Sequence, residues 1–187
     1  LGDIAIEQAD LPKAKALFLS GLQQLHAFQS KGHPLIAQAW NNLGEYELKL
    51  DNFAQAIQWH QNALKLRIKL FGEKHEKTAD SYNNIGNCLL ELGNYAAAQQ
   101  MHEHALHIRR AILPPNHADI AVSHNNLGNC AYFSGDFQEA AREYRAALNI
   151  REKTFGPRHN KITPTLNNLG KVLLEMGQWD QAMALFQ

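Results

Sequence analysis

The histidines and the glutamate of residues 102–107, HEHALH, stand close to the spacing of a helical zinc site. The motif His-Glu-x-x-His binds zinc because histidines four residues apart share one helix face, while the glutamate acts as a general base. Here Leu106 takes the place of the second histidine, and His107 comes one residue late. His104 and His107 are better explained as solvated surface residues than as metal ligands. We therefore predict no metal site.

Asparagine recurs in a pattern that carries a different chemistry. The motif N-N-(L/I)-G occurs at residues 41–44, 83–86, 125–128 and 167–170, at a constant spacing of 42 residues. Inside a helix, Asn costs about 0.6 and Gly about 1 kcal/mol relative to Ala, so the motif needs a reason. A side-chain amide both donates and accepts hydrogen bonds, and it can pair with the backbone of an extended peptide. The alternative, favoured for the first asparagine of each pair and disfavoured for the second, is that the amides join neighbouring repeats or cap backbone groups.

The same period of 42 residues runs through the whole chain. Aromatic residues share one register and alanines another: Phe53, Tyr95, Phe137 and Trp179, and Ala56, Ala98, Ala140 and Ala182. A gapless period between 20 and 50 residues indicates a solenoid of stacked units. We predict a single domain over residues 1–187, with repeats at about 33–74, 75–116 and 117–158 and partial copies at about 1–32 and 159–187.

Each repeat is predicted to contain two antiparallel helices joined by a tight turn. The first helix begins near Pro34 or its copies and ends at a glycine such as Gly93. The second opens at Asn52 and its copies, where Asp136 with Glu139 fits a capping box. No such unit can bury its apolar face alone, so stability must come from stacking on neighbours. Loops such as FGEKH connect the repeats, and the histidine that recurs in each of them is predicted to order its loop: His33, His75, His117 and His159.

The motifs together resemble the tetratricopeptide repeats. The resemblance rests on Trp40-Leu43-Gly44, on Gly93-Tyr95-Ala98 and on the small Ala105, while the 42-residue period and LNIREKTFGPRH are similar to the kinesin-light-chain subclass. It implies an all-α fold, an α-solenoid: a right-handed superhelix of about five antiparallel helix-turn-helix repeats whose first helices line a concave groove. His124 and Leu166 depart from the aromatic slot of the family pattern.

A helical wheel separates the two sides of the first helix. Leu43, Gly44 and Glu47 lie on the side predicted to pack on the second helix, where the glycine allows close approach. Carried over from the family, the opposite side lines the groove. The peptide-binding candidates there are Gln38, Asn42, Glu45, Lys49, Asp80, Asn84, Asn87, Glu91, Asn126, Asn129, Phe133, Asn168 and Lys171. The flanking candidates are Asn41, Asn83, Asn125, Asn167 and Tyr132.

Two further groups bear on ligand choice. Phe133 and Tyr132 are candidate anchors for an apolar side chain of the ligand, the alternative being that they pack within the repeats. The charged positions of the predicted groove are mildly acidic, with Glu45, Asp80, Glu91 and Glu175 against Lys49 and Lys171. This balance disfavours the family's binding of chaperone tails, and it counsels against assuming the acidic cargo peptides that kinesin light chains recognise. Arginines that recur near the end of each second helix are explained best by the helix C-terminus and surface ion pairs, although they could also help with acidic ligands: Arg67, Arg109 and Arg151.

Composition and the remaining motifs exclude several classes of protein. The 18 basic and 18 acidic residues balance, which argues against nucleic acid and membrane-surface partners. No apolar run is long enough to cross a membrane. Cys88 and Cys130 lie a whole repeat apart, too far for a simple disulfide, and favour a cytoplasmic location. No phosphate loop or nucleophile elbow is present, so we predict no enzyme activity and no cofactor.

The sequence therefore predicts a protein–protein interaction scaffold that binds an extended peptide or protein segment. The contacts would come from an asparagine ladder, formed by the second asparagine of each motif: Asn42, Asn84, Asn126 and Asn168. The alternative is a regulatory or sensor arm of a larger multidomain protein, such as a caspase-like protease or a nucleotide-binding ATPase. Residues 1–2 and 186–187 fall partway through predicted helices. We expect an excised array whose apolar ends allow end-to-end self-association.

Overall fold

The computed structural model describes residues 16, 17, 19–21, 23 and 32–185. Over residues 32–185 the chain is helical throughout, without a β-strand. The elements are α3 (Pro34–Lys49), α4 (Phe53–Phe71), α5 (Glu76–Glu91), α6 (Tyr95–Ile112), α7 (Ala118–Phe133), α8 (Phe137–Phe155), the 3-10 turn η1 (Asn160–Ile162), α9 (Thr163–Glu175) and α10 (Trp179–Ala184). The prediction of an all-α fold built from helix pairs is confirmed. The partial repeat expected at residues 1–32 lies almost wholly outside the described residues.

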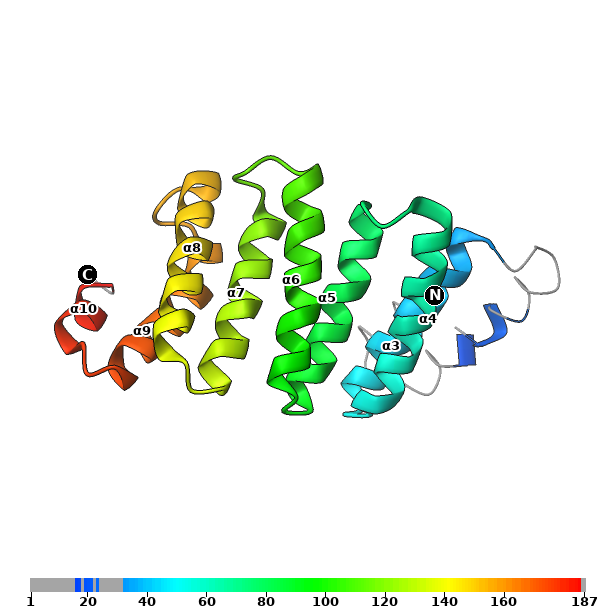
Figure 1. The fold of residues 1–187 in the computed structure, drawn as a ribbon, viewed down its shortest axis with the longest axis horizontal. Coiled ribbons are helices and arrows are strands. Elements are labelled where there is room, and N and C mark those ends of the chain that lie inside the picture. The colour runs from blue at the N-terminus through cyan, green and yellow to red at the C-terminus, as the bar shows by residue number, and fades with distance from the viewer. Residues whose placement is uncertain (1–15, 18, 22, 24–31, 186–187) are drawn as a thin grey trace. The chain divides into compact units, whose positions relative to one another are not determined.

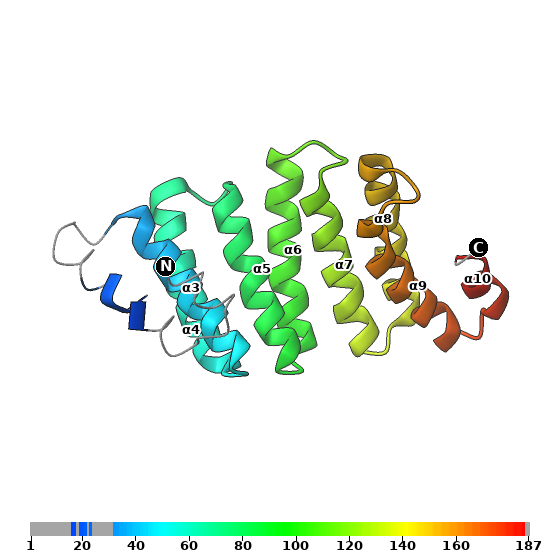
Figure 2. The ribbon, with the colours of Figure 1, turned by 180° about the vertical axis from the view of Figure 1, so that it is seen from behind.

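The chain divides into two compact units, residues 1–92 and 93–187. In the first unit α3 packs on α4, and α4 packs on α5 (Figure 1). In the second unit α7 lies between α6 and α8, and α8 and α10 both contact α9 (Figure 2). The second helices α4 and α8 thus contact both their own first helix and the first helix of the following repeat, and α6 contacts the first helix α7 that follows it. The prediction of a single domain concerns the two units together and stays a prediction.

Glycine lies where two helices of one pair approach closely. A Cβ atom on Gly44 would stand 2.5 Å from the imidazole of His60, and one on Gly128 would stand 2.6 Å from the ring of Tyr144. Real Cβ atoms do not come so near to a ring, so any larger residue would force the helices apart. The predicted reason for the glycine of the N-N-(L/I)-G motif is confirmed at both positions.

The turns between paired helices need a left-handed residue. Gly93, Gly135 and Gly177 have φ angles of +74°, +85° and +70°. The equivalent position of the second repeat is Asp51, whose φ of +58° is strained for a residue with a side chain. The glycine stops predicted from the sequence are confirmed, and the second repeat makes the same turn without one.

The recurring loop histidines begin the first helices. In each, the imidazole Nδ1 accepts a hydrogen bond from the backbone N–H two residues later, at 3.1–3.2 Å. The residues are His33, His75, His117 and His159. This bond satisfies one of the N–H groups that a helix start leaves unpaired. The prediction that these histidines order the loops is confirmed.

Two helix starts differ from their predictions. The carboxylate of Asp136 accepts from the N–H of Glu139 at 3.0 Å, but the N–H of Asp136 donates to the carbonyl of Ala131, so only half of the capping box forms. Asn52 does not cap α4, because its amide donates to Glu47 Oε2 at 2.9 Å instead. Here the turn competes with the helix for the same polar side chain.

The last first-helix is shorter than its copies. A 3-10 turn over Asn160–Ile162 precedes α9, which begins at Thr163. Pro164 lies in the first turn of α9. Proline has no N–H group and restricts the residue before it, so an α-helix that starts upstream would break at this point. The first helix predicted for this repeat, the copy of Pro34–Leu50, would begin at Asn160, which is three residues before α9 begins.

Arginine joins each second helix to the next repeat. Arg67 Nη1 donates to the carbonyl of Lys77 at 3.0 Å and to Ser81 Oγ at 2.8 Å. Arg109 contacts Asp119 and Ser123 in the same way, and Arg151 contacts Lys161 and Thr165. We call these contacts the arginine bridges. Arg67 and Arg109 are buried, with exposed fractions of 3% and 5%. Their burial contradicts both a surface ion pair and a ligand contact, whereas Arg109 does lie in the last turn of α6, as the helix C-terminus interpretation predicts.

Candidate functional site

The predicted peptide-binding residues all come from first helices: α3 and α5 in the first unit, α7 and α9 in the second. None of them is buried. Exposed members are Gln38, Lys49, Glu91, Phe133, Lys171 and the flanking Asn167. Half-buried members are Asn42, Glu45, Asp80, Asn84, Asn87, Asn126, Asn129, Asn168 and the flanking Asn41, Asn83, Asn125 and Tyr132. The helical wheel thus placed the candidates on the solvent side of these helices, and we call them the candidate surface.

In the first unit, one asparagine amide joins α5 to α3. Asn84 Nδ2 donates to Asn41 Oδ1 and to Glu45 Oε1, both at 3.0 Å. Burial raises the pKa of Glu45, whereas the nearby Lys49 opposes that shift. The sequence interpretation assigned the bridge between repeats to the first asparagine of each pair. The structure uses both, because the second asparagine supplies the donor and the first supplies the acceptor.

The second unit has a related contact between α9 and α7. Asn168 Nδ2 donates to Asn129 Oδ1 at 3.5 Å, and the same oxygen accepts from the hydroxyl of Tyr144 at 2.7 Å. Thr165 Oγ1 donates to Asn125 Oδ1 at 3.3 Å, so the flanking asparagine again faces the next repeat. Within the described part of the chain, the Oδ1 atoms of Asn84 and Asn168 accept no hydrogen bond.

Other candidates pair along their own helix. Gln38 Nε2 donates to Asn42 Oδ1 at 2.7 Å, one turn later on α3. On α5 the carboxylate of Asp80 lies 3.5 Å from the ammonium of Lys77. Such local contacts fix side-chain rotamers at the surface and add little stability.

The two aromatic candidates have different surroundings. Phe133 has an exposed fraction of 55% and stacks on Tyr95, with 5.8 Å between ring centroids. Tyr132 is half-buried, packs on the core of the second unit, and lies 5.8 Å from the ring of Phe137. Phe133 therefore presents an exposed ring, whereas Tyr132 is mostly absorbed into repeat packing.

A cavity of about 390 Å³ lies beside the candidate surface in the second unit. It is lined by Ala118, Val122, Asn125, Arg151, Phe155, Lys161 and Pro164. Its walls are mainly apolar, and the ammonium of Lys161 lies 4.7 Å from the centroid of the Phe155 ring. The sequence interpretation missed this cavity, although Val122 and Pro164 fall in the register of Gln38 and Asp80. That shared register was the available signal.

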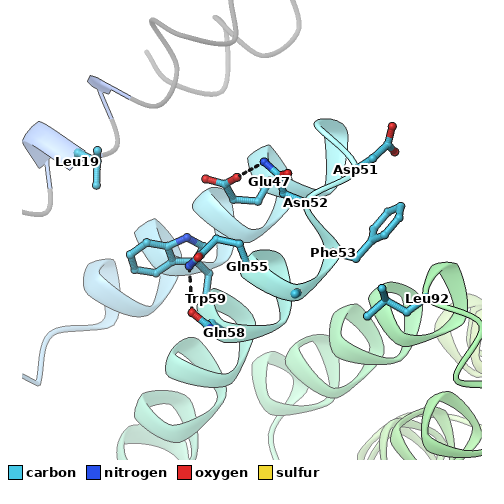
Figure 3. A pocket seen from close by; sticks show the side chains of 10 residues that line it. Leu19, Glu47, Asp51, Asn52, Phe53, Gln55, Gln58, Trp59 and Leu92 are labelled. Carbon is cyan, nitrogen blue, oxygen red and sulfur yellow. Dashed lines mark hydrogen bonds between the residues drawn. The ribbon is translucent and has the colours of Figure 1, made fainter.

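A larger cavity of about 780 Å³ lies in the first unit at the turn between α3 and α4 (Figure 3). Its lining includes Glu47, Asn52 and Trp59, and Figure 3 shows hydrogen bonds from Asn52 to Glu47 and from Gln55 to Gln58. None of the predicted binding residues lines it. Two pairs of its polar side chains bond to each other, whereas the buried indole Nε1 of Trp59 makes no hydrogen bond within the described residues.

The described residues offer no catalytic or metal-binding cluster. No group of three or more His, Cys, Asp or Glu among them could hold a metal ion. Burial raises the pKa of the Cys88 and Cys130 thiols to about 12, so neither is a thiolate nucleophile at neutral pH. His102 is fully buried in the slot that Tyr144 fills one repeat later. No helix among the described residues has the length and apolar character needed to cross a bilayer.

The comparisons with known proteins agree on the type of repeat. A family model for the tetratricopeptide repeat matches residues 35–111 and 115–187. No curated protein sequence matches the chain. Among solved structures, BtubC (BKLC) from P. vanneervenii superposes with a TM-score of 0.89 at 23% identity, covering 99% of this chain and 74% of that one.

Two further structures have the same fold at lower identity. The Podosopora anserina putative kinesin light chain repeats superpose with a TM-score of 0.84 at 17% identity, covering 100% of this chain and 88% of that one. A Rap protein complexed with Competence and Sporulation Factor superposes with a TM-score of 0.79 at 17% identity, covering 99% of this chain and 50% of that one. At these identities the likeness concerns the fold alone.

Proposed function

Because the chain belongs to the tetratricopeptide repeat family, and is a helical protein-interaction scaffold of that family, we propose that it binds an extended peptide along its first helices. The candidate surface would contact the peptide backbone, and the adjoining cavity at Val122 and Pro164 would select side chains. The role is one of binding and not of catalysis. The free, buried Cys88 and Cys130 support a reducing compartment such as the cytoplasm.

The observation that carries this proposal is the orientation of the asparagine amides. The Nδ2 atoms of Asn84 and Asn168 are held by acceptors on the preceding first helix of the same unit. The Oδ1 atom of each amide accepts no hydrogen bond within the described residues, so it is available to a ligand N–H. An acceptor fixed before binding loses little rotamer freedom when the ligand arrives, which favours affinity.

The geometry of repeats fits the geometry of a strand. Stacked helices lie about 9 Å apart, and an extended peptide rises about 3.3 Å per residue. One ladder position per repeat would thus meet every third peptide residue. Backbone recognition tolerates many sequences, so selectivity would come from the cavity at Val122 and Pro164 and from the exposed ring of Phe133.

A peptide chosen by the protein itself tests the proposal. Peptides would be selected from a random display library on the 187-residue chain, and each backbone nitrogen of the best binder would then be methylated in turn. We expect binding to weaken about tenfold at every third position, since each methyl group removes one N–H donor.

Two variants separate the ladder from the helix surface in general. Asn168→Ala should weaken the selected peptide by about tenfold, whereas Asn149→Ala, at an exposed position on α8, should leave its affinity unchanged. Equal affinity of both variants, or a methylation scan without a three-residue period, would contradict the proposal.

A further inference from the structure

A chain of polar groups crosses the junction between α6, α7 and α8. Arg110 Nη2 lies 3.0 Å from His124 Nε2, and His124 Nδ1 lies 2.6 Å from Glu143 Oε2. The guanidinium can only donate, so His124 accepts at Nε2 and carries its proton on Nδ1, from which it donates to Glu143. Arg142 Nη2 contacts the second oxygen of Glu143 at 3.2 Å. His124 and Glu143 are buried.

The corresponding positions one repeat earlier carry no such groups. They are occupied by Ile68, Tyr82 and Met101 in place of Arg110, His124 and Glu143. The polar trio is therefore not part of the repeating pattern of the sequence. Replacing apolar contacts by a buried charged pair is often neutral or unfavourable for stability, so stability alone does not explain the trio.

Beside the trio lies a cavity of about 350 Å³. Its apolar walls are Leu113, Pro115, Ile120 and Ile150, and its polar groups are Arg110 and His124. Ile120 and Ile150 are buried, whereas Arg110 and Pro115 are exposed and form the mouth. A volume of this size lies at the lower end of known small-molecule sites, which run from about 300 to 1,000 Å³.

The guanidinium of Arg110 has capacity for a ligand. In the part of the chain that the structure describes, its hydrogen bond is to His124, and a guanidinium has five N–H donors in all. The imidazole of His124 fixes the guanidinium of Arg110, because Glu143 in turn fixes the imidazole. A planar fork of donors that is fixed in this way matches a carboxylate, which it can bind through both oxygens.

We propose that this cavity binds a small aliphatic carboxylate, with the carboxylate on Arg110 at the mouth and the aliphatic body against Ile120 and Ile150. A single lining cation fits one negative charge better than the two of a phosphate monoester. The site is separate from the candidate surface, since its walls come from α6, from the loop that follows α6, from α8 and from α7 residues outside the predicted set.

Hexanoate is the probe, titrated calorimetrically into the full 187-residue chain. We expect one hexanoate per chain and a shift of the His124 ring ¹⁵N resonances. Hexanol lacks the charge and acetate lacks the tail, so the affinity of each should be at least about tenfold lower than that of hexanoate. Parent protein that does not bind hexanoate, or that binds hexanol equally well, would overturn the proposal.

Matched variants come from the chain itself. Arg110→Ile introduces the residue found one repeat earlier and should weaken hexanoate binding by about tenfold or more. The triple variant Arg110→Ile, His124→Tyr, Glu143→Met introduces all three residues of the earlier repeat and guards against misfolding of the single variant. Arg145→Ile removes an exposed arginine of α8 away from the cavity and should bind hexanoate normally. Unweakened binding by the folded triple variant would also overturn the proposal.

Discussion

Replacing His60 by phenylalanine should stabilise the protein and flatten its response to acid. The side chain of His60 is fully buried, and neither ring nitrogen makes a hydrogen bond in the described part of the chain. An unpaired buried polar group costs about 1–3 kcal/mol. Tyr144 fills the equivalent slot against Gly128, with the same close approach that His60 makes to Gly44. A six-membered ring is therefore compatible with this position.

The dependence on pH follows from the imidazole pKa. Burial, and to a lesser degree the charge of Arg67, lowers the pKa of His60 from 6.5 to about 4. The unfolded chain takes up a proton below pH 6.5, while the folded chain resists it until about pH 4. The contribution of the neutral imidazole is thus complete above pH 6.5 and is lost as the pH falls through this window. One such histidine removes roughly 2 kcal/mol between pH 7 and pH 5.

His102 has the same environment, with a pKa lowered to about 4 by burial and then by Arg109. The parent should therefore lose roughly 4 kcal/mol of unfolding free energy between pH 7 and pH 5, and His60→Phe about half of that. Urea denaturation at several pH values measures both quantities. His107→Phe, at an exposed position, is the control and should follow the parent. A His60→Phe variant with the parent's pH slope, or with lower stability at pH 7, would refute the reasoning.

Four other variants test separate features. Asp51→Gly should raise the unfolding free energy by about 1 kcal/mol in urea melts, since glycine relieves the left-handed strain at φ +58°; a loss would contradict this. Gly128→Ala should cost about 1–3 kcal/mol in the same assay, because its Cβ would stand 2.6 Å from Tyr144; unchanged stability would show that the helices separate freely. Asn84→Ala should cost about 1 kcal/mol net, as two hydrogen bonds outweigh the better helix propensity; a higher melting temperature would mean that the bridge contributes nothing. Trp179→Gln should weaken any self-association seen by sedimentation, because that ring is 63% exposed; an unchanged profile would remove Trp179 from the contact.

The period of the sequence was enough to predict what each repeat does by itself. The glycine of N-N-(L/I)-G, the glycine stops and the loop histidines act within one hairpin or one loop, where local spacing decides the partner. The helix pairs follow from the same pattern.

Contacts between repeats were harder to predict. Arg67 reaches Ser81 on the following helix, and Asn84 reaches Asn41 on the preceding one. These pairs depend on how far neighbouring helices are rotated and on which rotamer a long side chain adopts. A helical wheel contains neither quantity. The polar trio at His124 was visible only as a departure from the aromatic slot, because its partners lie on two other helices.

The arginine bridges repeat the same set of contacts at three boundaries between repeats. Each bridge ends on a backbone carbonyl and on the hydroxyl of a serine or threonine 14 residues after the arginine. A backbone carbonyl is present whatever residue supplies it, so only the arginine and the hydroxyl must be kept. The bridge would therefore form again when repeats cut at their loops are duplicated, deleted or exchanged between arrays, whereas the polar trio at His124 would have to be matched at its own junction. The length of such an array, and hence the length of the segment it can hold, becomes adjustable in steps of one repeat.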